Sequence, residues 1–363
     1  MASTSGAPEQ AWADLVDSLR DAGERLVAQT AELSEMERAD ALRALLRGLN
    51  NQLGRFEVDR ERPELVAFNG WREKMFMDNP DFRYWVADIR DDRRYRITGA
   101  VGDAVYQSIT VYTSAGTLES SATSRRDSDD LTIADDGTFS VVLSREQPGD
   151  GSDWMALPEG ATAVWVRHFH HDVAADELGW CRIDPIDPVE PEPPIDPARF
   201  ARHIQRLGRG ISAFPAMFDH AVRKDLESPN EVRHWSEMTG GAAFTEPDIH
   251  YLRGSWQLGA DEALVIEGVP AACRYWSALL YSRFLNSLDH RSRRVSLTDA
   301  TATLVDDRYR LVLAGRDPGG EGDWLDTEGR AFGIFVLRFL QPTTEPELPT
   351  VHVVSLTDLE AGS

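Results

Sequence analysis

Cysteine and lysine are both scarce in this chain of 363 residues. The two cysteines, Cys181 and Cys273, lie far apart and form no CxxC pattern, so the sequence indicates neither a disulfide scaffold nor a structural zinc site. Lys74 and Lys224 are the only lysines among 38 basic residues, and all the others are arginines. No run of about 18 apolar residues occurs, and the start of the chain lacks the basic and apolar regions of an export signal. We therefore expect a cytoplasmic protein without membrane spans.

Positive charge is also in deficit. The chain has 38 basic and 61 acidic residues, which gives a net charge of -23. Such a field repels phosphate backbones and anionic lipid surfaces, and no local basic patch opposes it. Nucleic acids and membranes are therefore excluded as expected partners. A small molecule is the expected partner, no tightly bound cofactor is expected, and assembly into a homo-oligomer stays open.

Two kinds of periodicity alternate along the chain. Apolar residues recur at helical spacing across residues 8–49, where Ser34 and Glu37 have the spacing of a capping box. From Tyr95 onward short β-type runs follow, separated by turn residues. Six prolines across residues 185–197 predict an extended linker, after which the order of helix and then strands is repeated.

The predicted organisation has six parts. They are an N-terminal helical region (1–79), a first β-sandwich repeat (80–184), a proline-rich linker (185–197), a helical segment (198–245), a second β-sandwich repeat (246–358) and a tail (359–363). We therefore expect an α+β protein with two tandem antiparallel β-sandwich repeats, jelly-roll-like in form, each preceded by amphipathic helices.

Matched residues at a nearly constant spacing indicate an internal duplication. The matched pairs are Pro80-Asp81 with Pro247-Asp248, Tyr84 with Tyr251, Tyr106 with Tyr275, Tyr112 with Tyr281, Asp153-Trp154 with Asp323-Trp324, and Arg167 with Arg338. Their spacing changes only from 167 to 171 residues. Chance resemblance does not hold so narrow a spacing, so we predict two copies of one helix-plus-strand unit.

Several segments of both halves resemble a known family. They include DNPDFRYWVADI, YRITGAVGDAVYQSITVY and DDGTFSVVLS in the first half, and RYWSALLYSRFLNSLD, DPGGEGDWLDTEG and FVLRFL in the second. These are similar to proteins carrying the domain of unknown function 1214, in which a YW pair, an Asn-Ser-Leu-Asp stretch, an Asp-Trp turn and a strand arginine follow one another. The resemblance extends over nearly the whole chain. It implies a β-sandwich or jelly-roll-like fold and no particular activity.

The second repeat holds the richer group of polar and aromatic residues. The predicted ligand-binding residues are Arg274, Tyr275, Trp276, Asn286, Trp324 and Arg338, and the predicted catalytic residues are Asp323 as acid with His290 or Asp289 as base. The first repeat has Gln107 where the second has Trp276, so we expect the ligand to contact mainly the second repeat. The alternative, a histidine and carboxylates on exposed turns, stays open.

Each repeat also has an arginine inside an apolar strand. Because a buried guanidinium needs a carboxylate partner, we expect Arg167 to pair with Asp153 and Arg338 with Asp323. Such pairs would pin a loop to a strand. Alternatively, the arginine and its neighbouring tryptophan hold an anionic ligand group.

A histidine motif follows Arg167. His168 and His170 face the same side of a predicted strand, and Asp172 stands at its end. Residues of this type in this pattern hold metals in some proteins. Surface or interdomain histidines are the simpler interpretation, so no metal is expected.

An acidic motif lies in the first repeat. Asp127, Asp129 and Asp130 have the DxDD spacing used by class II terpene cyclases, in which a protonated aspartic acid protonates an alkene. No helical barrel repeats accompany the motif, and a solvated acidic loop is the simpler interpretation.

The sequence therefore predicts a cofactor-independent enzyme of lyase, isomerase or hydrolase type. Its substrate would be a small, partly apolar metabolite such as a lipid, isoprenoid, steroid or glycoside, and its chemistry would use carboxylate and histidine acids and bases. The alternative is a non-catalytic small-molecule-binding or assembly protein. Ionisable groups close together in an enclosed site would favour the enzyme.

Overall fold

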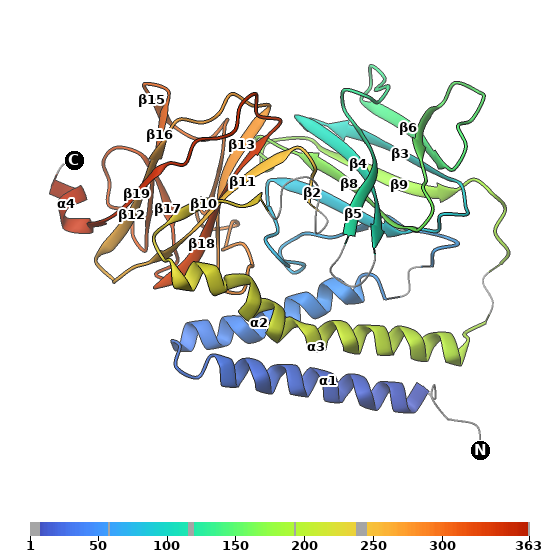
Figure 1. The fold of residues 1–363 in the computed structure, drawn as a ribbon, viewed down its shortest axis with the longest axis horizontal. Coiled ribbons are helices and arrows are strands. Elements are labelled where there is room, and N and C mark those ends of the chain that lie inside the picture. The colour runs from blue at the N-terminus through green and yellow to red at the C-terminus, as the bar shows by residue number, and fades with distance from the viewer. Residues whose placement is uncertain (1–7, 57–58, 115–119, 192–193, 237–244, 362–363) are drawn as a thin grey trace.

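The computed structural model describes residues 8–56, 59–114, 120–191, 194–236 and 245–361. Parts of the predicted N-terminal region, proline-rich linker, helical segment and tail lie outside these ranges. The described chain forms two β-sandwiches side by side, with three long helices along one side of both (Figure 1). The protein is thus α+β with two β-rich repeats, as the sequence predicts.

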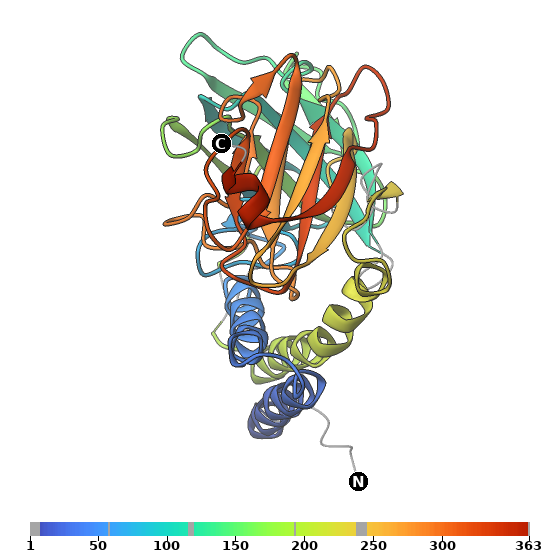
Figure 2. The same ribbon diagram turned by 90° about the vertical axis from the view of Figure 1, so that its left-hand side faces the viewer.

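The helices come from both halves of the chain and pack together. Their bounds are Pro8–Gln29 (α1), Glu35–Leu53 (α2), Pro197–Glu227 (α3) and the short Leu356–Ala361 (α4). Leu26, Leu45 and Phe214, one from each long helix, belong to a single apolar cluster. The predicted capping box begins α2, since the amide of Glu37 donates to Ser34 Oγ at 3.3 Å. Figure 2 shows α2 and α3 beneath the sandwiches and α1 below these two helices.

None of the described helices combines the length and apolarity that crossing a membrane requires.

The first repeat folds into two sheets. Its strands are Val66–Ala67 (β1), Phe82–Asp88 (β2), Tyr95–Gly102 (β3), Tyr106–Ser114 (β4), Ser120–Asp127 (β5), Thr138–Ser144 (β6), Asp153–Ala156 (β7), Ala161–Phe169 (β8) and Leu178–Pro185 (β9). One sheet has the order β1-β2-β8-β4-β5 and the other β7-β6-β3-β9. The pairs are antiparallel except for β6 with β7, which is parallel.

The second repeat has the same plan. Its strands are Val232–His234 (β10), Ile249–Gln257 (β11), Glu262–Gly268 (β12), Tyr275–Tyr281 (β13), Ser296–Thr298 (β14), Leu304–Val305 (β15), Arg308–Ala314 (β16), Asp323–Asp326 (β17), Phe332–Leu340 (β18) and Thr350–Ser355 (β19). One sheet has the order β10-β11-β18-β13-β14 and the other β15-β16-β12-β19, with β17 parallel to β16.

Strand register confirms the duplication. The matched cross-strand triplets are Tyr84, Arg167 and Ser108 on β2, β8 and β4, and Tyr251, Arg338 and Ser277 on β11, β18 and β13. The strands that carry Tyr112 and Tyr281, β4 and β13, therefore occupy equivalent positions. The pairs matched by spacing in the sequence are matched in space as well.

The two sandwiches pack against each other through one sheet each. On β8, Val164 and Val166 face the core of the first sandwich. Phe169 instead joins the apolar cluster of the second repeat, where its ring lies 6.1 Å from that of Tyr275. Alternation along the strand thus divides its side chains between two cores. We call the contact between the two sheets the junction.

Candidate functional site

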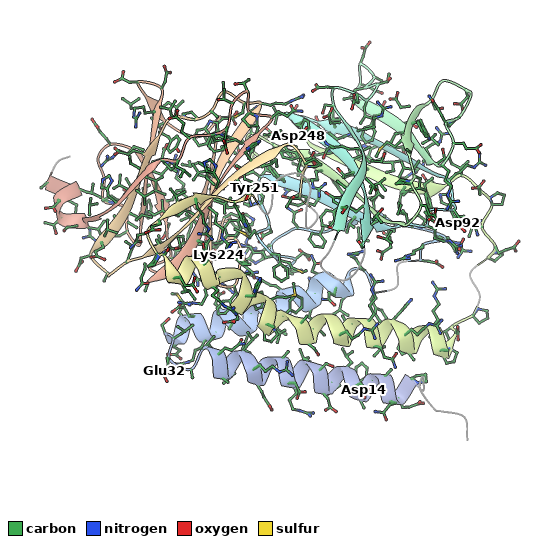
Figure 3. All side chains as sticks on the ribbon, viewed as in Figure 1. Asp14, Glu32, Asp92, Lys224, Asp248 and Tyr251 are labelled. Atoms are coloured by element: carbon green, nitrogen blue, oxygen red, sulfur yellow. The ribbon has the colours of Figure 1, made fainter. Side chains whose placement is uncertain are left out.

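Matched arginine and tyrosine pairs occupy the centre of the junction. Arg167 Nη2 donates to Tyr112 Oη at 3.1 Å, and Arg338 Nη2 donates to Tyr281 Oη at 2.6 Å. Tyr251 lies beside the second pair, with the Arg338 guanidinium 5.7 Å from its ring, and is labelled between the sandwiches in Figure 3. Arg167 is 2% exposed and Arg338 is 4% exposed. The junction therefore contains two buried guanidinium groups, one from each repeat. Each of them requires a negative charge nearby.

Arg167 obtains this charge from the other half of the chain. Glu246 Oε2 lies 3.6 Å from Arg167 Nη1 and accepts from Ser108 Oγ at 2.5 Å. Glu246 Oε1 accepts from Arg125 Nε at 2.7 Å and from Tyr106 Oη at 3.4 Å. The carboxylate is buried, and each of its two oxygens accepts at least one hydrogen bond. We call Tyr106, Ser108, Arg125, Arg167 and Glu246 the Glu246 cluster.

The predicted pairs of Asp153 with Arg167 and Asp323 with Arg338 are wrong. Asp153 accepts from a threonine amide at 2.6 Å, and Asp323 accepts from Arg294 Nη2 at 2.7 Å. Both aspartates lie on the short parallel strands of the outer sheets. The arginines point the other way, into the junction, so their own repeat cannot supply the partner.

Arg338 forms no ion pair with any residue that the structure describes. Its Nη1 atom is buried and has no hydrogen-bond partner in the described chain. The same holds for Tyr275 Oη, Ser277 Oγ and Asp81 Oδ2. We call Asp81, Tyr275, Ser277 and Arg338 the Asp81 cluster. Such orphaned groups are rare in native proteins and require an explanation.

The ionisable groups of the Asp81 cluster influence each other. Burial raises the pKa of Asp81 to about 7, against the opposing effects of the Arg338 charge and the Ser296 hydroxyl. Burial, and then the nearby Asp81, raise the pKa of Tyr275 well above its ordinary value, while Ser277 opposes the rise. Near neutral pH, Asp81 therefore takes both protonation states while Tyr275 keeps its proton.

The two clusters differ in the residue at one matched position. Asn79 and Glu246 each precede a Pro-Asp pair, 167 residues apart. They hold the same backbone position, because the amide of Phe82 donates to Asn79 O at 3.2 Å and the amide of Ile249 donates to Glu246 O at 3.4 Å. The first repeat thus receives a carboxylate where the second receives a neutral side chain.

The remaining predicted binding residues are dispersed. Trp276 packs on Tyr309 within the second core, with 5.5 Å between ring centroids. Arg274 pairs with Asp129 at 2.8 Å, and the indole of Trp324 donates to a backbone carbonyl at 3.0 Å. Of the six predicted ligand-binding residues, Tyr275 and Arg338 are the two that meet in the Asp81 cluster.

Asn286, Asp289 and His290 belong to a loop beside another buried cation, Lys74. Lys74 Nζ donates to Ser287 O and Leu288 O, both at 2.7 Å. Burial lowers the pKa of Lys74 to about 8. Burial, and then the charge of Lys74, lower the pKa of His290 to about 4, so His290 is neutral at pH 7 and a weak base.

The two other residues of this loop have structural partners. Asp289 accepts from the amide of Arg291 at 3.1 Å and from Ser292 Oγ at 2.7 Å, which closes a turn. Asn286 accepts from Arg47 at 3.4 Å. In the described chain, no hydrogen bond or ion pair joins Asp289 or His290, the two alternative predicted bases, to the predicted acid Asp323, which pairs with Arg294 instead.

The segment 68–81 connects these features. It has no helix or strand, and Phe76 and Met77 have φ angles of 42° and 65°. The amide of Met77 donates to Leu285 O at 2.7 Å, and Leu285 itself has a φ of 58°. Met77 O accepts from Arg338 Nη2 at 3.2 Å. Left-handed backbone at bulky residues is strained, and such strain is commonest at functional sites.

The histidine motif does not form a metal centre. Both ring nitrogens of His168 are buried without partners in the described residues, and burial lowers its pKa to about 3. His170 Nδ1 lies 3.0 Å from Asp176 Oδ2, and Asp172 accepts from the amide of Ala174 at 3.1 Å. Within the described ranges, no group of three or more His, Cys, Asp or Glu side chains is placed to hold a metal ion.

The three aspartates of the acidic motif form ion pairs with arginines. Asp127 is buried and lies 2.9 Å from Arg125 Nη2, while Asp129 pairs with Arg274 across the junction. Asp130 lies 3.8 Å from Arg126 Nη1. The three carboxylates therefore have separate partners.

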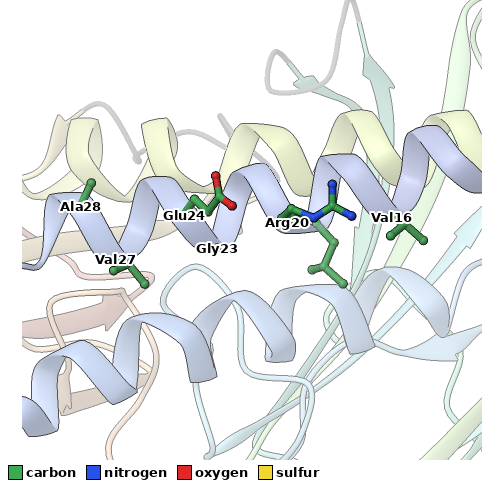
Figure 4. A pocket seen from close by; sticks show the side chains of 7 residues that line it. Val16, Arg20, Gly23, Glu24, Val27 and Ala28 are labelled. Atoms are coloured by element: carbon green, nitrogen blue, oxygen red, sulfur yellow. The ribbon is translucent and has the colours of Figure 1, made fainter.

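Two open grooves lie elsewhere. One of about 600 Å³ runs along α1 between Val16 and Ala28, and Figure 4 shows its mostly apolar lining. Another of about 550 Å³ lies between α3 and the first repeat, where Asp59 pairs with Arg199 at 2.9 Å and Asp88 with Arg55 at 2.6 Å. Neither groove contains a predicted site residue.

Comparisons with known proteins agree with this architecture, which defines a tandem β-sandwich protein. The model of the family described as protein of unknown function (DUF1214) matches residues 87–172 and 260–344. Each repeat therefore carries one copy of this domain, in tandem, and the resemblance seen in the sequence is confirmed.

A solved structure shows the same fold. The crystal structure of an uncharacterized protein from Burkholderia cenocepacia has 26% sequence identity and a TM-score of 0.89, covering 96% of this chain and 98% of that one. The crystal structure of the VPA0106 protein from Vibrio parahaemolyticus is less similar, with 11% identity and a TM-score of 0.48, covering 86% of this chain and 98% of that one. No curated protein matches the sequence.

Proposed function

We propose that this protein is a cofactor-independent enzyme that acts on a small, partly apolar metabolite by acid–base chemistry, with Asp81 as the group that transfers the proton. The observation that supports the proposal is a buried carboxyl group with a pKa of about 7 beside three orphaned polar groups. A general acid or base works best when its pKa lies near the operating pH. Perturbed and unpartnered groups of this kind gather at functional sites.

The surrounding residues suit this role. Tyr275 keeps its proton and can donate a hydrogen bond, while Arg338 can stabilise negative charge that develops on a substrate. The rings of Phe82 and Phe169 lie 5.5 Å and 6.1 Å from that of Tyr275 and supply apolar contact. Asp81 thus replaces Asp323, Asp289 and His290 as the proposed catalytic group, and Tyr275 and Arg338 keep their predicted place.

Substrate would enter past the segment 68–81. This segment covers Arg338 through Met77 O, and its strained residues Phe76 and Met77 can relax when it moves. The cytoplasm remains the proposed location of the protein. Its two cysteines, Cys181 and Cys273, are free thiols, which is typical of proteins in a reducing compartment.

A non-catalytic binding protein is the second candidate. The Glu246 cluster favours it, because the same framework there holds a carboxylate by hydrogen bonds and ion pairs without any reaction. In that case Asp81 would tune the affinity for a ligand and would not transform it.

Untargeted mass spectrometry distinguishes an enzyme from a non-catalytic binding protein. We expect wild-type protein incubated with a bacterial metabolite extract to deplete one metabolite and accumulate a product. Asp81→Asn should reduce turnover at least about 100-fold, since general acid–base catalysis contributes that much or more. Asp248→Asn is the matched control, because Asp248 is the equivalent residue of the other repeat and should leave turnover intact.

Three results would contradict the enzyme proposal. They are a wild-type protein that retains a metabolite without changing it, a wild-type protein that affects no metabolite, and an Asp81→Asn variant that is as active as wild type. The first of these would favour the binding protein.

A further inference from the structure

The two clusters of the junction differ by one carboxylate. In the first repeat, Ser108, Tyr106 and Arg167 all meet the carboxylate of Glu246. Their counterparts in the second repeat are Ser277, Tyr275 and Arg338, which hold the same strand positions. In the part of the chain that the structure describes, Ser277 Oγ, Tyr275 Oη and Arg338 Nη1 form no hydrogen bond, although the Ser277 hydroxyl lies close enough to Tyr275 to oppose the rise in its pKa.

The charge of Arg338 makes this difference costly. A guanidinium stays ionised in proteins, and a buried cation without a counter-charge is strongly unfavourable. The partners that the structure gives Arg338 are neutral, namely Tyr281 Oη and Met77 O. The junction therefore holds a buried cation without a counter-charge in the described chain, opposite the strand that carries the two hydroxyl donors.

Asp81 does not supply this counter-charge. It lies close enough for Arg338 to lower its pKa, yet the two form no ion pair, and Asp81 Oδ2 is itself without a partner among the described residues. A carboxylate bound directly to Arg338 would have a pKa below the ordinary value of an aspartate, whereas the pKa of Asp81 is raised.

We propose that the Asp81 cluster binds the carboxylate group of a small organic acid, in the position that the Glu246 side chain occupies in the first repeat. The inference rests on the proposed function for the existence of a substrate, and it names the substrate's class as a partly apolar monocarboxylic acid. One guanidinium and two hydroxyl groups match one carboxylate, whereas a phosphate dianion calls for more positive charge. The rings of Phe82 and Phe169 beside Tyr275 contact the apolar part of the acid.

Sodium benzoate is the probe, and benzamide is its neutral counterpart of the same shape. Calorimetry at constant ionic strength should show benzoate binding to the full-length protein at least about ten-fold more tightly than benzamide, since hydrogen bonds to a charged group exceed those to a neutral one. Sodium chloride added in place of benzoate controls for simple ions. Benzoate should also raise the melting temperature.

Two variants at one position test the place of binding. Asn79→Glu supplies the missing carboxylate from the protein itself and should weaken benzoate binding at least about ten-fold. Asn79→Gln has the same size without the charge and should bind within about three-fold of wild type. Should Asn79→Glu fail to fold, Ser277→Ala removes one donor and should weaken binding by about ten-fold.

The outcomes separate this inference from the proposed enzyme. Benzoate that binds no better than benzamide, or that binds equally to Asn79→Glu and Asn79→Gln, overturns the carboxylate site and leaves water as the partner of the three donors. Benzoate binding without turnover of any metabolite keeps the site and overturns the enzyme. Turnover that survives Asn79→Glu keeps the enzyme and overturns the site.

Discussion

The Glu246 cluster and the Asp81 cluster share a framework and differ in what completes it. Each has a buried arginine on the central strand, a serine opposite it and a tyrosine two positions before that serine. Glu246 closes the first cluster with ion pairs to Arg125 and Arg167. Asn79 holds the matching position in the second cluster and brings no charge. The comparison shows that the residue at one position decides whether a carboxylate of the protein balances the buried arginine.

The two clusters also differ in the residue that the edge strand of each sheet supplies. The strand β5 supplies Arg125 to the first cluster, where it pairs with Glu246 at 2.7 Å and Asp248 at 2.9 Å. The equivalent position on β14 is Ser296, which cannot balance a charge. Asp81, the counterpart of Asp248, is therefore buried without an ion pair in the described chain, and its pKa is raised to about 7. The first cluster is thus closed by ion pairs, whereas the second holds a carboxyl group with a raised pKa.

The largest expected effect comes from removing the closing carboxylate. Glu246→Ala should lower the free energy of unfolding by about 3 to 5 kcal/mol, because it removes the buried carboxylate that balances the charges of Arg167 and Arg125. Asn79→Ala at the matched position should cost less, about 1 to 2 kcal/mol, since it strands the buried amide of Asp81, which donates to Asn79 Oδ1 at 3.0 Å, but no charge. Urea unfolding of both variants measures the difference. Equal losses would contradict the division between the two clusters.

The sequence predicts the fold better than the site, for a physical reason. Periodicity and turn residues are local, so the two sandwiches and their matched strands can be recognised from the chain alone. The partner of Arg167 is Glu246, which lies 79 residues further along the chain and in the other repeat. No local pattern shows which face of a strand meets a second domain, so Asp153 is the wrong partner.

Asp81 shows the same limit. It belongs to the Pro80-Asp81 pair that marks the repeat, yet only the folded chain shows that it lies beside Arg338. The signal that was available is the change from Glu246 to Asn79 within two otherwise matched segments.

The pH dependence of stability tests the Asp81 cluster next. The pKa of Asp81 rises from 3.8 to about 7 on folding, so the native state binds more protons than the unfolded state between these values. The free energy of unfolding should therefore fall as the pH rises from about 4 to about 7, by up to about 4 kcal/mol from this group. Asp81→Asn should remove this part of the fall. Urea unfolding of both proteins at intervals of pH gives the difference, and parallel pH profiles would show that Asp81 has an ordinary pKa.

Variants of the matched serines, Ser108 and Ser277, compare the two clusters through smaller changes in the free energy of unfolding. Ser108→Ala removes a donor to the buried Glu246 carboxylate and should cost about 1 to 3 kcal/mol. Ser277→Ala removes a hydroxyl without a partner in the described chain and should cost less than about 0.5 kcal/mol when no ligand is present. Thermal and urea unfolding compare the two. A larger loss for Ser277→Ala than for Ser108→Ala would mean that the second cluster is already satisfied within the protein.

The smallest effect is expected where the junction reaches the surface. Asp129 pairs with Arg274 across the repeats at 2.8 Å, but their side chains are 64% and 28% exposed, so water and salt weaken the pair. Asp129→Asn should therefore cost less than about 1 kcal/mol, and the cost should vanish in about 1 M salt. Arg274 keeps its contact with the Tyr106 ring, 5.0 Å away, and its bond to Val105 O. The same variant tests the DxDD spacing, because an enzyme that protonated its substrate through this motif would lose turnover with Asp129→Asn, whereas one that uses Asp81 keeps it. A loss of more than about 2 kcal/mol would show that the repeats are held together by their rim and not by the buried clusters.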